Sequence, residues 1–268
     1  MNKQRLDLLL VERGLVENRS LAQRLVMAGQ VRVNDQVMLK PAVQVAPEAI
    51  VTVDHGPPFV SRGGEKLVAA LESFPVKVKG LICADIGAST GGFTDCLLQH
   101  GAQTVYSIDV GEGILHWKIR QDPRVVVLEG VNARFILSLP QPVQLVTVDA
   151  SFISVKILIP VIRGWFGQNN PETTADVIVL IKPQFEAGRS ETTRGDGVIR
   201  NPEVHRRVLQ EVLTCAKSEN YAVKGLIRSP LIGPKGNVEF LAWFSYPVDE
   251  QINFLPWIDQ LIGNMQEP

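Results

Sequence analysis

Short apolar runs recur along the middle of the chain, and polar or glycine-rich residues follow each of them. Runs of this kind are typical of parallel strands that are buried on both faces of a sheet. Stretches with apolar residues at helical spacing separate them. The pattern therefore predicts an α/β fold with a doubly wound, mostly parallel, Rossmann-like sheet. The predicted parallel strands are Leu81 to Ile86, Thr104 to Val110, Val125 to Glu129, Leu145 to Ala150 and Val177 to Lys182.

Two further apolar runs, Tyr221 to Ile227 and Val238 to Phe244, bring the predicted sheet to seven strands. We expect the last strand to return antiparallel to the fifth. It would then begin at the edge of the sheet where the parallel strands end. Glu239 lies at that beginning, so we expect its side chain at the same edge.

A polar, glycine-containing segment, 184–198, follows the fifth strand and includes Arg189 and Arg194. A long segment without periodicity is typical of a mobile substrate loop. It ends at Asn201-Pro202, which should begin a helix because asparagine is a good N-cap and proline suits the first helical position.

The amino-terminal residues predict a separate, small α+β unit with two helices and a hairpin over 31–39. Either Asn18 or Ser20 can cap the second helix, and Ser20 and Gln23 have the spacing of a capping box. Prolines stiffen the sequence that follows this unit. We therefore predict a first domain at 1–54, a connector at 55–60, a second domain at 61–247, and a tail at 248–268 with at most a short helix.

The first parallel strand runs into a glycine-rich turn and then a helix, which is the start of a nucleotide-binding βαβ unit. The turn departs from the dinucleotide pattern G-x-G-x-x-G. Asp85 would repel a pyrophosphate but suits a cationic ligand such as S-adenosylmethionine. A dinucleotide and a purely structural turn remain alternatives. We predict that this methyl donor binds at Asp85, Gly87, Ala88, Ser89, Thr90, Gly91, Gly92 and Phe93.

Asp109 ends the second parallel strand, some twenty residues after the glycine turn, which is the usual place for a carboxylate that holds a ribose. A strand-end turn residue is the alternative. Asn132 follows the third strand, and we predict more weakly that it meets the adenine edge.

Charged groups also end the fourth and fifth strands, at Asp149 and Lys182. Neighbouring parallel strands end at one edge of the sheet, so we expect the two side chains to meet beside the ligand; a structural salt bridge is the alternative. Lys66 lies near the start of a helix, where its charge opposes the helix dipole. It is either an ordinary surface lysine or part of the same site, together with Glu239.

Composition excludes several classes of protein. The net charge is −1, so the overall balance indicates no class of partner. Three scattered cysteines without a C-x-x-C pair predict no metal, no disulfide framework and a reducing, cytoplasmic location. Asp149 and Lys156 interrupt the longest apolar region, Val143 to Ile162, so we expect no membrane span, and residues 1–20 lack the apolar core of a signal peptide.

Residues 1–40 hold seven lysines and arginines against four aspartates and glutamates, a surplus of three. An ordinary solvated face would explain this charge equally well. However, Leu6 to Leu15, Asn18 to Ala22 and Ala28 to Asn34 resemble the RNA-binding domain named after ribosomal protein S4. The resemblance implies RNA binding by this unit. The candidate RNA contacts are Arg5, Arg19, Arg24 and Arg32, with Arg62 at the start of the second domain.

The chain as a whole resembles the TlyA family of FtsJ-type ribose 2′-O-methyltransferases, historically labelled hemolysins. Besides the amino-terminal unit, the resemblance rests on the segments Val60 to Leu67, Asp85 to Thr94, Asp149 to Ser154, Ile181 to Glu186 and Gly233 to Phe240. It implies S-adenosylmethionine as donor, ribosomal RNA or ribosomal subunits as partner, and a cytidine ribose as acceptor. The catalytic tetrad that it implies is Lys66, Asp149, Lys182 and Glu239.

In the mechanism we expect, Lys182 takes or directs the proton of the ribose hydroxyl. Lys66 would lower the proton affinity of Lys182, while Asp149 and Glu239 hold its amine in place. Two departures from the family are Pro57 to Val60 in the connector and Gly130 to Asn132. The alternative functions are a non-catalytic RNA-binding or ribosome-assembly factor, a nicotinamide oxidoreductase and a membrane-active hemolysin.

Overall fold

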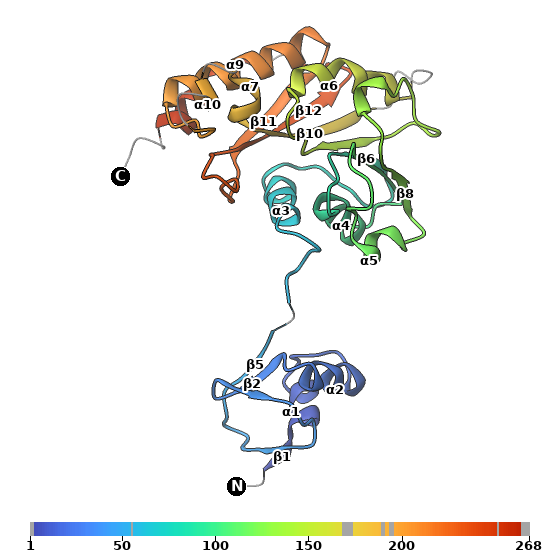
Figure 1. Cartoon of the computed structure of the whole chain (residues 1–268), viewed down its shortest axis with the longest axis vertical. Coiled ribbons are helices and arrows are strands. Elements are labelled where there is room, and N and C mark those ends of the chain that lie inside the picture. The colour runs from blue at the N-terminus through green and yellow to red at the C-terminus, as the bar shows by residue number, and fades with distance from the viewer. Residues whose placement is uncertain are drawn as a thin grey trace. The chain divides into compact units, whose positions relative to one another are not determined.

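The computed structural model describes residues 3–54, 56–167, 174–188, 191–192, 196–250 and 252–263. The chain divides into two compact units, Met1–Pro58 and Phe59–Pro268 (Figure 1). His55 of the expected connector, and Arg189 and Arg194 of the expected substrate loop, lie outside the described residues.

The second unit is built on the predicted seven-stranded sheet, in the order β11-β12-β10-β9-β6-β7-β8. Strands β6 to β10 are parallel to one another, and β12 pairs antiparallel with β10 and β11. The predicted strands are confirmed, with ends that differ by at most two residues. Their bounds are β6 Ile82–Ile86, β7 Thr104–Ile108, β8 Val125–Leu128, β9 Leu145–Val148, β10 Ala175–Ile181, β11 Ala222–Arg228 and β12 Phe240–Tyr246.

Helices cover both faces of this sheet (Figure 1). On one face, α3 (Gly63–Ser73) and α4 (Gly92–Gln99) contribute Leu67 and Leu97 to one buried cluster. On the other face, α6 (Val155–Ile162), α9 (Pro202–Ser218) and α10 (Leu255–Gly263) belong to a second cluster. Because α10 buries Ile258 and Ile262 there, part of the predicted tail contributes to the core.

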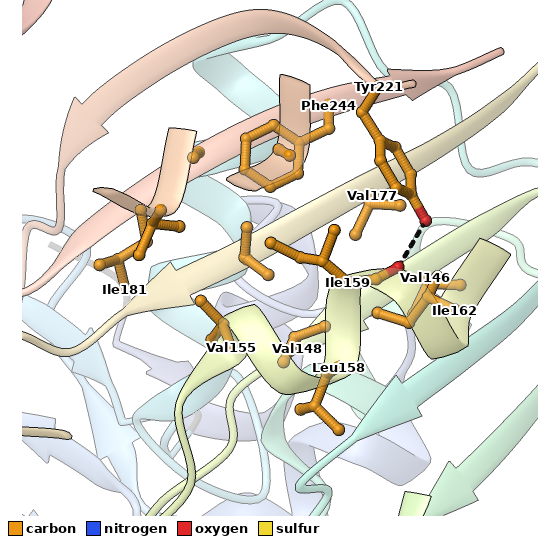
Figure 2. Packing of buried hydrophobic residues seen from close by; sticks show 14 of the residues in the cluster. Val146, Val148, Val155, Leu158, Ile159, Ile162, Val177, Ile181, Tyr221 and Phe244 are labelled. Carbon is orange, nitrogen blue, oxygen red and sulfur yellow. Dashed lines mark hydrogen bonds between the residues drawn. The ribbon is translucent and has the colours of Figure 1, made fainter. Parts of the chain in front are cut away.

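Figure 2 shows part of the second cluster, where aliphatic side chains of β9 and β10 lie together with those of α6. The run of valines that predicted β9 supplies Val146 and Val148, both fully buried. Tyr221 places its hydroxyl in this apolar setting and donates a hydrogen bond of 3.0 Å to the carbonyl oxygen of Ile159. A buried hydroxyl needs such a partner, and this one joins α6 to the start of β11.

Short helical elements occupy several connections. They are α5 (Trp117–Arg120), η1 (Ala133–Phe135), η2 (Arg163–Trp165) and α7 (Pro183–Glu186). The segment predicted as a substrate loop therefore begins with a helical turn, α7, which follows Lys182 directly.

The first unit has one apolar core, shared by α1 (Leu6–Glu12), α2 (Arg19–Met27) and a small sheet. The predicted hairpin is present, and Asn34 and Asp35 adopt the positive φ values of 47° and 64° that a tight hairpin turn requires. Asn18 caps α2, whereas the capping box is wrong, because Gln23 binds Asp7 instead. The strands are β1 Gln4–Arg5, β2 Val31–Val33, β3 Gln36–Met38, β4 Gln44–Val45 and β5 Val51–Val53.

Candidate active site

The glycine turn between β6 and α4 has a shape that excludes larger residues at two positions. Gly87 has φ +80°, and a Cβ atom there would lie 2.7 Å from the carbonyl oxygen of Asp149. Gly91 has φ +96°, and a Cβ atom there would lie 2.9 Å from Cδ1 of Leu115. Both backbone conformations favour glycine. The turn forms a bare cradle of main chain that lies against the end of β9.

Asp85 lies beneath this cradle, within the sheet. Its carboxylate is fully buried and accepts hydrogen bonds from Oγ1 of Thr94 at 2.7 Å and Oγ1 of Thr147 at 3.0 Å. Burial raises the pKa of Asp85 to about 7, although both hydrogen bonds act in the opposite direction. The side chain supports the turn from within; a direct contact with a ligand, as predicted, would require it to leave this position.

Asp109 also supports the turn. Its two oxygens accept hydrogen bonds of 2.7 Å from the backbone nitrogens of Ser89 and Gly111. A carboxylate can accept about four hydrogen bonds, so Asp109 retains capacity for a ribose. Asn132 uses its side-chain oxygen to cap η1, at 3.2 Å from the backbone nitrogen of Arg134.

The four residues of the predicted tetrad form two ion pairs. Nζ of Lys182 lies 2.6 Å from Oδ1 of Asp149, and Nζ of Lys66 lies 2.6 Å from Oε2 of Glu239. The predicted meeting of Asp149 and Lys182 is therefore present. We expected Glu239 to hold the amine of Lys182, but Glu239 pairs with Lys66 instead. Lys66 lies on α3, and Glu239 directly precedes β12.

Lys182 has further acceptors besides its carboxylate. Its Nζ donates to Oγ of Ser151 at 3.0 Å and to the carbonyl oxygen of Asp149 at 3.3 Å. The amine is thus held in one direction at the end of β10, where side-chain rotation alone would leave it free.

Both ion pairs line a single pocket of about 910 Å³, together with Gly87, Ala88, Ser89, Thr90, Gly92 and Phe93 of the glycine turn. This volume lies within the usual range for pockets that bind small molecules or cofactors. The buried amide oxygen of Gln184 also lines the pocket and accepts no hydrogen bond from the described residues. An unpaired acceptor beside a glycine cradle fits a polar ligand that carries hydrogen-bond donors, as S-adenosylmethionine does.

An aromatic side chain stands at the mouth of this pocket. Phe152 is 92 % exposed and lines the pocket, with its ring centroid 5.1 Å from that of Phe185. It has φ +64°, which is rare for a large side chain. Ser151, Phe152 and Gln184 are not among the site residues predicted from the sequence. Their places after Asp149 and Lys182 on neighbouring strands were the signal available.

The predicted RNA contacts differ in their surroundings. Arg5 and Arg19 both bind the buried carboxylate of Asp7, with side chains 36 % and 52 % exposed. The Arg5 guanidinium holds the pKa of Asp7 far below its usual range. These two arginines therefore contribute to the fold of the first unit. Arg24 and Arg32 are exposed, and Arg62 is exposed at the rim of the pocket.

Two negative findings concern the described residues. No helix among them is both long enough and apolar enough to cross a bilayer. Their histidine, cysteine, aspartate and glutamate side chains form no group of three that could hold a metal ion.

Comparison with known proteins relates both units to families. The profile of the FtsJ-like methyltransferase matches residues 59–246, and that of the S4 domain matches residues 4–51. The chain is 42 % identical over 253 residues to "16S/23S rRNA (cytidine-2'-O)-methyltransferase TlyA" of Mycobacterium tuberculosis, covering 93 % of this chain and 92 % of the relative. It is 39 % identical over 243 residues to "Hemolysin A" of Brachyspira hyodysenteriae, covering 90 % and 99 %.

A solved structure described as "Putative hemolysin from Streptococcus thermophilus" superposes with a TM-score of 0.72 at 38 % identity, covering 99 % of this chain and 96 % of that one. The named relatives thus carry both the methyltransferase and the hemolysin label. The fold, the glycine cradle and the two ion pairs agree with the first of these labels. The chain belongs to the TlyA family of FtsJ-like methyltransferases and carries an amino-terminal S4 domain.

Proposed function

We propose that this protein transfers the methyl group of S-adenosylmethionine to the ribose 2′-hydroxyl of a cytidine in ribosomal RNA. The observation that carries the proposal is the pair of lysine–carboxylate contacts in one pocket with the glycine cradle. The names of the TlyA relatives support the cytidine and the ribosomal RNA. Ribosomal subunits are the proposed partner, and the cytoplasm is the proposed location.

The donor would lie against Gly87 to Gly92, with Asp109 available to its ribose and Asn132 near its adenine. Asp85 would hold the cradle from beneath, through Thr94 and Thr147. When bound, S-adenosylmethionine supplies a methyl group on a positively charged sulfur. The unpaired oxygen of Gln184 offers an acceptor to a ligand in the same pocket.

The acceptor is a ribose hydroxyl, which is a weak nucleophile and must lose its proton during the reaction. We propose that Nζ of Lys182 takes this proton, so that the new oxygen–carbon bond would form as the bond between the methyl carbon and sulfur breaks, leaving a neutral thioether and a protonated amine. Only the neutral amine can do so, and Asp149 and Ser151 fix its direction. Lys66 and Glu239, which line the same pocket, would orient the ribose.

The RNA would be bound at two places. Phe152 offers an exposed aromatic face on which a base can stack, and Arg62 offers a positive charge at the rim for a phosphate. The S4 domain would supply further phosphate contacts through Arg24 and Arg32. Arg5 and Arg19 are less available, because both bind Asp7.

The test is to map ribose methylation on ribosomal RNA from cells that lack the protein, from complemented cells, and from cells with a Lys182→Ala variant. We expect at least one cytidine to be 2′-O-methylated only when the intact protein is present. Identical methylation maps in all three strains, with the protein expressed and folded, would contradict the proposed function.

A further inference from the structure

A buried carboxylate next to the catalytic pocket has no part in the mechanism above. Glu186 ends α7, four residues after Lys182, and is 8 % exposed. Its Oε1 accepts a hydrogen bond of 2.7 Å from the backbone nitrogen of Val155, and its Oε2 accepts one from the hydroxyl of Ser154. Burial raises the pKa of Glu186, and these hydrogen bonds offset part of that effect.

Both partners of Glu186 lie at the start of α6. Ser154 is the N-cap of this helix, and its hydroxyl also accepts a hydrogen bond of 3.2 Å from the backbone nitrogen of Lys156. Glu186 thus accepts a hydrogen bond from a free backbone N–H in the first turn of α6, although it lies on another element more than thirty residues along the chain. A carboxylate is favourable at a helix N-terminus. An ordinary cap is local, and Ser154 already supplies one.

The same two segments meet at two further places. At the catalytic end, Lys182 contacts Asp149 and Ser151. Between that end and Glu186, the ring of Phe152 contacts the ring of Phe185. Three sets of contacts therefore join segment 149–155 to segment 182–186. The residues in the contacts of Glu186 do not line the pocket, whereas those in the other two sets do.

The backbone of segment 149–155 is strained, because Phe152 has φ +64°. Such a conformation in a bulky residue persists only where the surrounding contacts enforce it. The hydrogen bonds of Glu186 to Ser154 and Val155 fix the segment two residues after Phe152. Without them, the segment could relax and move Asp149 and Ser151 away from Lys182.

We propose that Glu186 is a positioning residue for methyl transfer. It holds segment 149–155 so that Asp149 and Ser151 face Lys182 and the ring of Phe152 stays at the pocket mouth. This inference rests on the proposed function, since methyl transfer is the reaction that it supports.

The test is single-turnover transfer of labelled methyl to ribosomal RNA by Glu186→Gln, which keeps the size of the side chain. Displacing reacting groups by about 1 Å costs up to about 100-fold, so we expect transfer to fall roughly 10- to 100-fold with donor and RNA affinities nearly unchanged. Glu211→Gln is the matched control. Glu211 pairs with the side chain of Lys156 on α6 but does not bind the backbone of that helix, so we expect a normal rate.

A double-mutant cycle separates positioning from general stabilisation. If Glu186 acts through segment 149–155, the loss caused by Glu186→Gln should shrink in a Ser151→Ala background, because the contact it preserves is already gone. Ser154→Ala, which removes one partner of Glu186, should lower transfer in the same direction and serves if Glu186→Gln fails to fold. Folding is monitored by thermal unfolding.

A normal rate in folded Glu186→Gln or Ser154→Ala would overturn the inference. So would a double variant in which Glu186→Gln lowers the rate by the same factor with and without Ser151→Ala. Either result leaves an active wild-type enzyme. Failure of the proposed function would instead leave the wild-type protein itself without ribose methylation, so the two failures are distinguishable.

Discussion

Nζ of Lys182 lies 2.6 Å from Oδ1 of Asp149, although the two residues are 33 positions apart in the chain. The contact follows from the sheet. β9 and β10 are neighbouring parallel strands, with Val148 opposite Val179, and both strands end at the pocket. The fold thus brings an acid and an amine together where a ligand can reach them.

The glycine cradle should be required for donor binding. Gly87→Ala places a Cβ atom 2.7 Å from the carbonyl oxygen of Asp149, a backbone atom that cannot rotate away, and should displace the turn, so that donor affinity, measured by calorimetry, falls at least tenfold. Gly80→Ala is the matched control, because Gly80 also has positive φ, at +81°, but has no atom within 4 Å of the added carbon. Similar backbone strain is then present without the clash. Equal affinities of the two variants would contradict the placement of the donor.

Asp85 should make stability depend on pH in an unusual direction. Its folded pKa of about 7 exceeds the ordinary value of 3.8. Between these two pH values the folded protein keeps a proton that the unfolded chain releases. The contribution of Asp85 to stability therefore falls as pH rises from about 4 to 7. Asp85→Asn cannot ionise, and its stability should rise relative to wild type over this window, by at most about 4 kcal/mol. Urea unfolding across the window measures this difference, and parallel stability curves would contradict the buried, protonated carboxyl.

Phe152 should contribute to RNA rather than donor binding. Loss of one aromatic stacking partner costs about 1–3 kcal/mol per base, so Phe152→Ala should weaken productive RNA binding roughly five- to a hundredfold. Phe135→Ala, which removes a ring that is 68 % exposed and does not line the pocket, is the control. The measurement is the RNA concentration at half-maximal single-turnover rate. A shift of equal size in both variants would argue against a base on Phe152.

The S4 domain should anchor the RNA through exposed charge. Arg24→Glu combined with Arg32→Glu should weaken RNA binding and reduce its salt dependence, without change in donor affinity. Lys77→Glu combined with Lys217→Glu, two exposed sites in the second unit, changes the net charge equally and is the control. Arg5 and Arg19 are unsuitable for this test because their loss would leave the buried Asp7 without its cations. If the RNA affinity measured in a filter assay is the same with and without the arginine changes, the anchor lies elsewhere.

Features that depend on strand periodicity and on the order of the strands along the chain could be predicted from the sequence. The apolar runs defined the seven strands, and the ends of β9 and β10 predicted the contact between Asp149 and Lys182. Lys66 was harder to place, because its partner depends on how α3 packs near the start of β12, 173 positions away. Arg5 and Arg19 looked like free basic residues, because the sequence did not reveal that Asp7 is buried between α1 and α2.

Asp85 illustrates a second limit. Its place at a strand end predicted a ligand contact, and the sequence did not reveal that its buried side chain binds Thr94 and Thr147. Short strands were also beyond prediction. β1 and β4 have two residues each, too few to establish an alternation of apolar and polar positions.

The central claim is that Lys182 takes the proton of the ribose hydroxyl. Single-turnover transfer of labelled methyl to ribosomal RNA tests it most directly, with donor and RNA affinities measured in parallel. Lys224→Ala is the control, since Lys224 pairs with Asp249 and does not line the pocket. Loss of a positioned base costs about 100- to 10,000-fold, so Lys182→Ala should lose transfer to that extent while both ligands still bind. Lys182→Arg should be equally inactive, because a guanidinium stays protonated; near-normal transfer by this variant would contradict the claim.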